Sequence, residues 1–195
     1  MSARNMGGGM SAIFQLTLSR PWPWAILGRG CRVLFPSTTD GQGRSQAVRP
    51  PPGVVGHYLA LQVGRGWDVE GAAFMERRLG LYVPADDGFP DGAIFAVARL
   101  SQVSTICNDS RAFGRPPEPW WRGSIAWWLD EVLAVEPLEC PEVASLTPVS
   151  QDFLPELRER FTLARDGLWR PSEARKNESP APLEASGTGQ FGLGL

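Results

Sequence analysis

The sequence is poor in the side chains that most often carry metal or acid–base chemistry. Its 195 residues include one histidine, two tyrosines and three cysteines that lie far apart in the chain. An odd number of widely spaced cysteines argues against a disulfide framework. A single histidine without a close pair of cysteines argues against a zinc site. We therefore expect neither a bound metal nor a cofactor.

The sequence also lacks a long apolar run. A helix that crosses a bilayer needs ~20 consecutive apolar residues, and no segment of the chain approaches that length. Pro21 and Pro23 interrupt the apolar stretch near the N-terminus, which a secretory signal peptide would keep continuous. These absences predict a cytoplasmic protein without a membrane partner.

Arginine and tryptophan, in contrast, are abundant in the N-terminal third. Residues 1–67 contain seven arginines and one acidic residue, a net charge of +6, whereas residues 68–195 carry a net charge of −8. Guanidinium groups match the geometry of phosphate, and indole rings stack on bases. This third of the chain is therefore predicted to bind an anionic ligand. The alternative is that the arginines reflect coding bias and not a binding function. Arginine supplies 18 of the 19 basic residues, as a GC-rich coding sequence would produce.

Apolar periodicity and helix-breaking residues predict one α+β domain over residues 13–168. Strands are expected over 13–19, 31–35, 57–64, 93–106, 124–135 and 143–148, and helices over 20–28, 68–79 and 152–165. Ser19 and Asp152 are the expected N-caps of the first and last helices. Residues 37–56 are predicted to form a long surface loop, residues 1–12 a flexible leader and residues 169–195 a disordered tail. This order suits a small, mostly antiparallel β-barrel with peripheral helices.

One stretch, Leu-Thr-Leu-Ser-Arg-Pro-Trp-Pro-Trp-Ala-Ile-Leu-Gly-Arg-Gly over residues 16–30, resembles the opening of the ASCH domain family. Members of this branch of the PUA-like fold begin with a strand, an Arg-Gln-Pro-Trp-like turn, a helix and a Gly-x-Lys-x-x-Glu-x-Arg strand. Segments 58–68, 92–100, 123–129 and 137–140 are similar to later parts of the family in the same order. The resemblance covers residues 13–165 and implies a PUA-like barrel.

The chain departs from the family at its functional strand. Aligned on Gly30, the expected lysine, glutamate and arginine are replaced by Cys31, Leu34 and Pro36. The resemblance therefore implies the fold but no catalytic residue, and whether the protein is an enzyme stays open, with the sequence leaning against it. Cys31 itself is interpreted either as small apolar filler or as a thiolate favoured by Arg29 and Arg32.

Together these features predict binding of a nucleic acid or nucleotide, with RNA favoured over DNA and a base, plain or modified, held in the barrel cleft. The residues expected at this interface are Arg20, Trp22, Trp24, Arg29, Cys31, Arg32, Arg44, Arg49, Trp67 and Trp127. Two alternatives remain: a small hydrolase resembling acetylcytidine amidohydrolases or ribonucleases, and a protein-interaction module from a phage or mobile element. The oligomeric state does not follow from the sequence.

Overall fold

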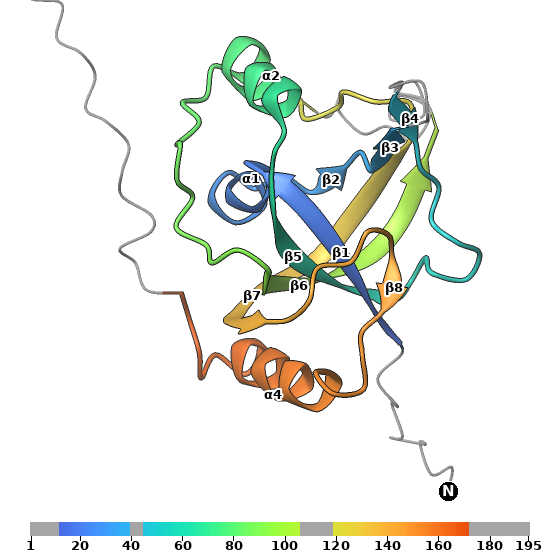
Figure 1. Ribbon diagram of the computed structural model, residues 1–195, viewed down its shortest axis with the longest axis vertical. Helices are drawn as coiled ribbons and strands as arrows, with labels where there is room; N and C mark the ends of the chain where they lie inside the picture. The colour runs from blue at the N-terminus through green and yellow to red at the C-terminus, as the bar shows by residue number, and fades with distance from the viewer. Residues whose placement is uncertain (1–11, 40–44, 106–118, 172–195) are drawn as a thin grey trace, which may run out of the picture.

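The computed structural model describes residues 12–39, 45–105 and 119–171 (Figure 1). Its strands are β1 (Ile13–Arg20), β2 (Val33–Leu34), β3 (Ser37–Thr39), β4 (Ser45–Ala47), β5 (Tyr58–Trp67), β6 (Ala93–Ser104), β7 (Ala126–Glu139) and β8 (Thr147–Pro148). Its helices are α1 (Trp22–Gly28), α2 (Val69–Leu79) and α4 (Leu154–Arg165). Most of the expected leader and tail lies outside the described residues, as do Arg44 and Cys107.

The α+β fold predicted from the sequence is confirmed, and its main sheet is mixed. Six strands are hydrogen-bonded in the order β2-β7-β6-β5-β1-β8. β1 runs parallel to β5, with Ile13 opposite Tyr58 and Leu18 opposite Val63, and the other neighbours in this sheet are antiparallel. The expected closed barrel is not shown, because hydrogen bonding in the described chain runs from β2 at one edge to β8 at the other.

The sheet separates two apolar cores. Residues 93–98 at the start of β6 are all buried, and successive side chains of a strand face opposite sides, so both faces of the sheet are covered here. The main core packs α1 and α2 against the sheet and includes Leu16, Ile26, Leu61, Met75 and Phe95. The second core packs α4 against the opposite face and includes Ile13, Ala60, Ile94, Leu157 and Phe161. In Figure 1, α2 and α4 accordingly lie at opposite ends of the molecule.

The helix boundaries follow from local signals, with two exceptions. Asp68 caps α2 by accepting a hydrogen bond from the amide of Gly71, and Gly80 ends the helix with a φ of 64°. The predicted caps of the other helices are wrong. Pro21 precedes α1 and Phe153 precedes α4, neither with a side-chain capping bond, because prolines at the first helical positions leave fewer amides to cap.

The stretch expected to be a long loop is more ordered than predicted. Within residues 37–56, β3 and β4 form a separate two-stranded antiparallel sheet, with Ser37 opposite Ala47. The predicted strand at residues 31–35 is correspondingly shorter, because only Val33 and Leu34 pair with β7. In the described part of the chain, no helix is long and apolar enough to cross a membrane.

Candidate functional site

A pocket of about 330 Å³ opens where the end of β1 meets the starts of α1 and α2. We call it the Trp22 pocket. It is lined by Thr17, Leu18, Ser19, Trp22, Leu34, Phe35, Ser37, Asp68, Glu70 and Arg122. Its wall therefore combines three charged side chains with hydroxyl groups and two aromatic rings. That mixture is typical of a site for a polar ligand with a flat apolar part.

The carboxylate of Asp68 joins the two helices at this pocket. Its Oδ1 accepts the capping bond from the amide of Gly71 at 2.8 Å, and its Oδ2 accepts from the indole Nε1 of Trp22 at 2.8 Å. The same Oδ2 accepts from Nη1 of Arg122 at 3.0 Å. Asp68 therefore fixes the position of the indole and of the guanidinium together.

The guanidinium of Arg122 also lies over the Trp22 ring, with its Cζ atom 5.5 Å from the ring centroid. Its Nη2 is 3.7 Å from a carboxylate oxygen of Glu70, whose side chain is 90% exposed at the rim. The charged groups of the pocket thus comprise two carboxylates and one guanidinium. Because this excess of negative charge disfavours a phosphate, the pocket suits a ligand that presents N–H donors.

Trp22 is the one predicted interface residue that the structure places in this pocket. The residues that sequence reasoning missed are Asp68, Glu70 and Arg122. In the sequence Asp68 and Glu70 stand at the start of the helix expected over 68–79, and Arg122 lies outside the arginine-rich N-terminal third. The Trp-Asp pair at the end of β5 was the available signal, because a capping carboxylate beside a strand end is positioned to hold other donors.

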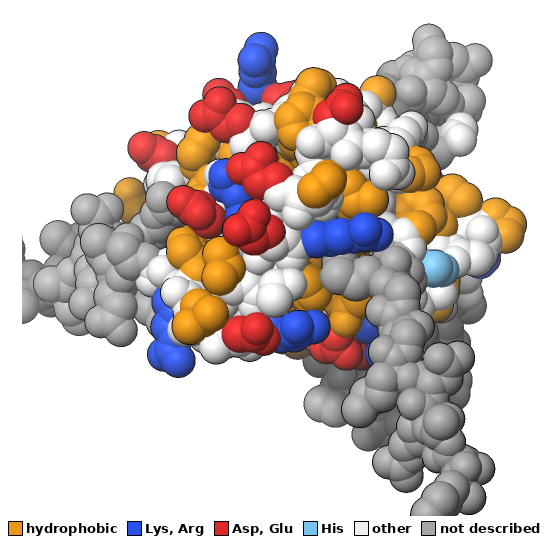
Figure 2. Space-filling view, turned by 90° about the horizontal axis from the view of Figure 1, so that it is seen from below, with side chains coloured by type: hydrophobic (Ala, Val, Ile, Leu, Met, Phe, Trp, Pro, Cys, Tyr) orange, Lys and Arg blue, Asp and Glu red, His pale blue; other side chains and the backbone are white. Residues whose placement is uncertain are grey.

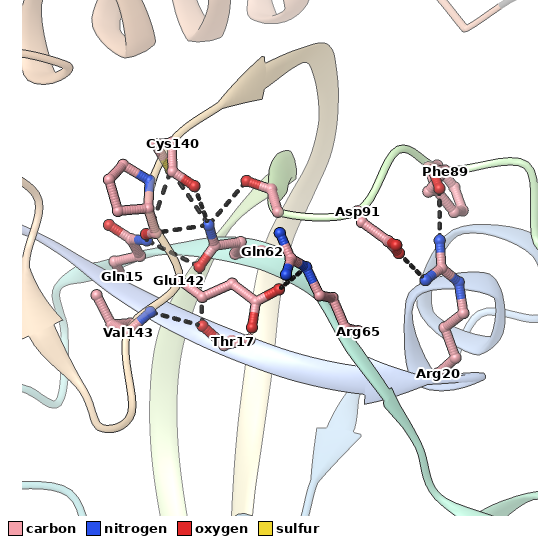
Figure 3. Close-up of polar contacts among 12 residues, drawn as sticks. Gln15, Thr17, Arg20, Gln62, Arg65, Phe89, Asp91, Cys140, Glu142 and Val143 are labelled. Atoms are coloured by element: carbon pink, nitrogen blue, oxygen red, sulfur yellow. Dashed lines mark hydrogen bonds and ion pairs between the residues drawn. The ribbon is translucent and has the colours of Figure 1, made fainter.

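Arg20, predicted to hold phosphate, uses all three guanidinium nitrogens within the protein. Its Nε donates to Oδ1 of Asp87 at 3.0 Å, and its Nη2 donates to the carbonyl oxygen of Phe89 at 2.5 Å. Its Nη1 pairs with Asp91, as Figure 3 shows. The side chain is 16% exposed. These contacts tie the end of β1 to the segment before β6.

Two further predicted residues lie at a different place in the fold. Trp24 lines a separate pocket on the other side of α1, and the exposed Arg29 lies over its ring with Cζ 5.0 Å from the centroid. Trp22 and Trp24 therefore do not share one binding surface. Helical geometry explains the separation, because residues two positions apart on a helix do not face the same side.

Cys31 and Trp127 are packed in the main core. Cys31 has no exposed surface, and its thiol donates to the carbonyl oxygen of Val33, as the apolar-filler interpretation expects. Trp127 is 1% exposed and donates from Nε1 to the carbonyl oxygen of Val48 at 2.9 Å. A ligand in the Trp22 pocket cannot stack on either of them.

The remaining predicted residues that the structure describes are at the surface. Arg32 donates from Nη1 to the carbonyl oxygens of Ile26 and Cys31, at 2.8 and 3.0 Å. Trp67 is 41% exposed at the end of β5, and Arg49 is exposed beyond β4. The face seen from the α4 side carries acidic and basic side chains interspersed with apolar ones, without a continuous basic area (Figure 2). The excess of arginine in the N-terminal third of the sequence therefore does not make this face basic.

A second polar cluster lies inside the fold around Gln62 (Figure 3), and its member Thr17 also lines the Trp22 pocket. Gln62 has no exposed surface; its Oε1 accepts from Gln15 and Thr17 at 2.8 Å each, and its Nε2 donates to the carbonyl oxygens of Gly92 and Cys140 at 2.8 Å each. Burial raises the pKa of the Cys140 thiol, although a hydrogen bond from Gln15 opposes the shift. The cluster holds the segment after β7 against β1 and β5, and its hydrogen-bonding groups are occupied. Among the described residues, no group of three or more His, Cys, Asp and Glu side chains could hold a metal ion.

Of the comparisons with known proteins, the one with solved structures found matches. No protein-family model matches the chain, and no curated protein sequence matches it. Among solved structures, it is similar to the ASCH protein of Zymomonas mobilis, with 13% identity, a TM-score of 0.45, and coverage of 76% of this chain and 94% of that one. A single-substitution mutant of the same protein gives 12% identity, a TM-score of 0.45, and coverage of 77% and 96%. Both of these solved structures are of an ASCH protein, and their names match the family that the sequence motifs resemble.

Proposed function

We propose that this protein binds a nucleic acid or nucleotide without transforming it, and that one base enters the Trp22 pocket. The observation that carries the proposal is the shared hydrogen bonding of Asp68 with Trp22 and Arg122. It holds an aromatic ring, a guanidinium plane and a carboxylate in fixed positions around one cavity.

Each of these groups matches a part of a nucleobase. Unstacked bases are recognised by stacking on aromatic rings or guanidinium planes and by hydrogen bonds to their polar edges. The exocyclic amino groups and ring N–H groups of bases donate, and the carboxylates of Asp68 and Glu70 are acceptors. The hydroxyl groups of Ser19 and Ser37 add partners suited to a ribose 2′-hydroxyl, which favours RNA over DNA.

In this proposal the phosphates lie outside the pocket, because the pocket carries an excess of negative charge. A phosphate beside Asp68 and Glu70 would face two carboxylates, whereas exposed arginines such as Arg49 can meet the backbone from the surface. The contributions of the base and of the phosphates to the binding affinity can therefore be measured separately. Arg49→Ala should reduce the slope of log affinity against log salt by about one, if Arg49 meets one phosphate.

The decisive experiment compares two exposed glutamates of α2. Glu70 lines the pocket, whereas Glu76 does not, and each loses one negative charge when changed to glutamine. Anisotropy of labelled single-stranded RNA and DNA would measure affinity for the wild type, Glu70→Gln and Glu76→Gln. Both variants remove one negative charge and so relieve the electrostatic repulsion of RNA to the same extent. Because only Glu70 lines the pocket, we expect Glu70→Gln to bind RNA about tenfold more weakly than Glu76→Gln.

Competition by free nucleosides provides the second measurement. A nucleoside that enters the Trp22 pocket should displace labelled RNA from the wild type and from Glu76→Gln but displace it less from Glu70→Gln. Equal affinities of the two variants, or RNA binding that no nucleoside displaces, would refute the pocket. Absence of binding at low salt would refute the nucleic-acid proposal and favour a protein-interaction module.

A further inference from the structure

A second pocket, on the far side of α1, has a different chemistry. This Trp24 pocket has a volume of about 130 Å³. Most of its wall is aromatic or aliphatic, and among the described residues that line it Asp87 is the one with an ionisable side chain. It is lined by Trp24, Leu27, Gly28, Asp87, Phe89, Phe95, Ala134, Val135, Pro137, Trp169 and Pro171.

The carboxylate of Asp87 is only half used by the protein. Its side chain is 0% exposed. Oδ1 accepts from Nε of Arg20 at 3.0 Å and from the amide of Phe89 at 3.2 Å. Oδ2 is buried and has no hydrogen-bond partner. Leaving a buried acceptor unpaired is costly, so such an atom calls for a partner that the protein itself does not supply.

Arg20 cannot turn to this oxygen, because its other two nitrogens are committed to Asp91 and to the carbonyl oxygen of Phe89. The charges also fail to balance. One guanidinium is shared by the buried carboxylate of Asp87 and the half-exposed carboxylate of Asp91, so the three groups have a net formal charge of −1. Arg29, which lies over the ring of Trp24, is exposed, so solvent screens its charge.

We propose that the Trp24 pocket binds a small organic ammonium ion with a flat apolar body, such as an arylalkylamine. The ammonium group donates to Oδ2 of Asp87 and supplies the missing positive charge. The apolar body lies against the rings of Trp24, Phe89 and Trp169, where cation–aromatic contact and burial add to binding. A neutral analogue leaves the charge uncompensated, and an anionic analogue is repelled.

Three probes that share one body test the charge requirement. Calorimetric titration with 2-phenylethylammonium, 2-phenylethanol and phenylacetate, each at millimolar concentration, should show binding of the ammonium ion. We expect the alcohol to bind about tenfold more weakly, because its hydroxyl can donate to Oδ2 but supplies no compensating charge, and phenylacetate not to bind. Equal binding of the ammonium ion and the alcohol, or no heat with any probe, would overturn the proposal.

Two variants locate the site. In Asp87→Asn the amide oxygen can still accept from Arg20 and Phe89, but the negative charge is gone, so ammonium binding should fall about tenfold. Asp130→Asn, which removes an exposed carboxylate on β7, is the matched control and should bind as the wild type does. Wild-type affinity of Asp87→Asn would contradict the assignment.

Trp169→Ala provides a test that does not depend on Asp87. Trp169 follows α4 and is half-buried, so its truncation leaves the sheet intact while removing an aromatic wall. Ammonium binding should weaken several-fold at an unchanged melting temperature. Unaltered affinity of this variant would refute the pocket even if Asp87→Asn failed to fold.

Discussion

The indole Nε1 of Trp22 donates to Oδ2 of Asp68 at 2.8 Å, although the two residues are 46 positions apart in the chain. This bond links the first residue of α1 to the N-cap of α2. One carboxylate therefore serves as helix cap, anchor for an aromatic ring and counter-ion for Arg122. Stability and the geometry of the Trp22 pocket are coupled through it.

The first prediction concerns this carboxylate. Asp68→Ala removes a helix cap, which costs about 1 kcal/mol, and leaves the Trp22 N–H without its acceptor, which costs about 1 kcal/mol more. We expect the free energy of unfolding, measured by denaturant titration, to fall by about 2 kcal/mol. Asp152→Ala, at a position with no capping bond to α4, should change it by less than about 0.5 kcal/mol. Equal losses in the two variants would contradict the role of Asp68.

The second prediction concerns Gly71, in the first turn of α2. Alanine ordinarily stabilises a helix relative to glycine by about 1 kcal/mol. At Gly71, however, a Cβ atom would lie 2.4 Å from Oδ2 of Asp68 and 2.8 Å from Nη1 of Arg122. Gly71→Ala should therefore lower the melting temperature and weaken RNA binding.

Gly28→Ala is the control for that variant. A Cβ atom at Gly28 meets the Trp24 ring at 3.6 Å, an ordinary contact, so this substitution in α1 should leave RNA binding unchanged. If Gly71→Ala raised the melting temperature, the close packing of Gly71 against Asp68 would be disproved.

The third prediction concerns the ionisation of Tyr58. Its hydroxyl donates to Oε2 of Glu131 at 2.6 Å, and this hydrogen bond raises the pKa of Tyr58 above its usual value of 10.0. Because the folded state holds the proton more tightly, the resulting stability is complete below the unfolded pKa and is lost as pH rises through the folded pKa. Absorbance titration in a Tyr82→Phe background should show the raised pKa, and Glu131→Gln should lower it. A Tyr58 transition at the usual pH in both proteins would exclude the interaction.

The fourth prediction concerns the buried cluster around Gln62. Gln62→Leu removes the donor to the carbonyl oxygens of Gly92 and Cys140 and the acceptor for Gln15. Each buried group left unpaired costs about 1–3 kcal/mol, so the free energy of unfolding should fall by about 3 kcal/mol or more. Gln151→Leu, at an exposed position, should change it by less than about 0.5 kcal/mol. A small effect of Gln62→Leu would show that water or relaxation satisfies these groups.

Sequence analysis correctly predicted the helices and strands whose positions depend on residues that are neighbours in the chain. The helix expected over residues 68–79 corresponds to α2, and the alternation of residues 57–64 predicted most of β5. The predicted caps of α1 and α4 were wrong because each helix has a proline in its first turn, which leaves fewer amides for a side chain to cap. Neither outcome required knowledge of the tertiary fold.

The candidate site escaped prediction because its members are distant in sequence. Arg122 reaches Asp68 across 54 positions, and no local pattern links a loop arginine to a helix cap. Summed charge misses such pairs for the same reason: Arg20 belongs to the arginine-rich third, but its partners Asp87 and Asp91 come from the acidic remainder. Summed charge along a chain does not reveal which charges the fold brings together.

The position of β1 in the sheet has a consequence for the order in which the chain can fold. Residues 13–20 leave the ribosome before both of their neighbours, β5 and the short β8, whose Thr147 and Pro148 pair with Gln15 and Phe14. Among the described strands, β1 therefore cannot have both edges paired until β8 has also been synthesised. Non-local pairing of this kind slows folding. Amide hydrogen exchange of residues 13–20 should be fast in nascent chains that end before Thr147 and slow once it has emerged.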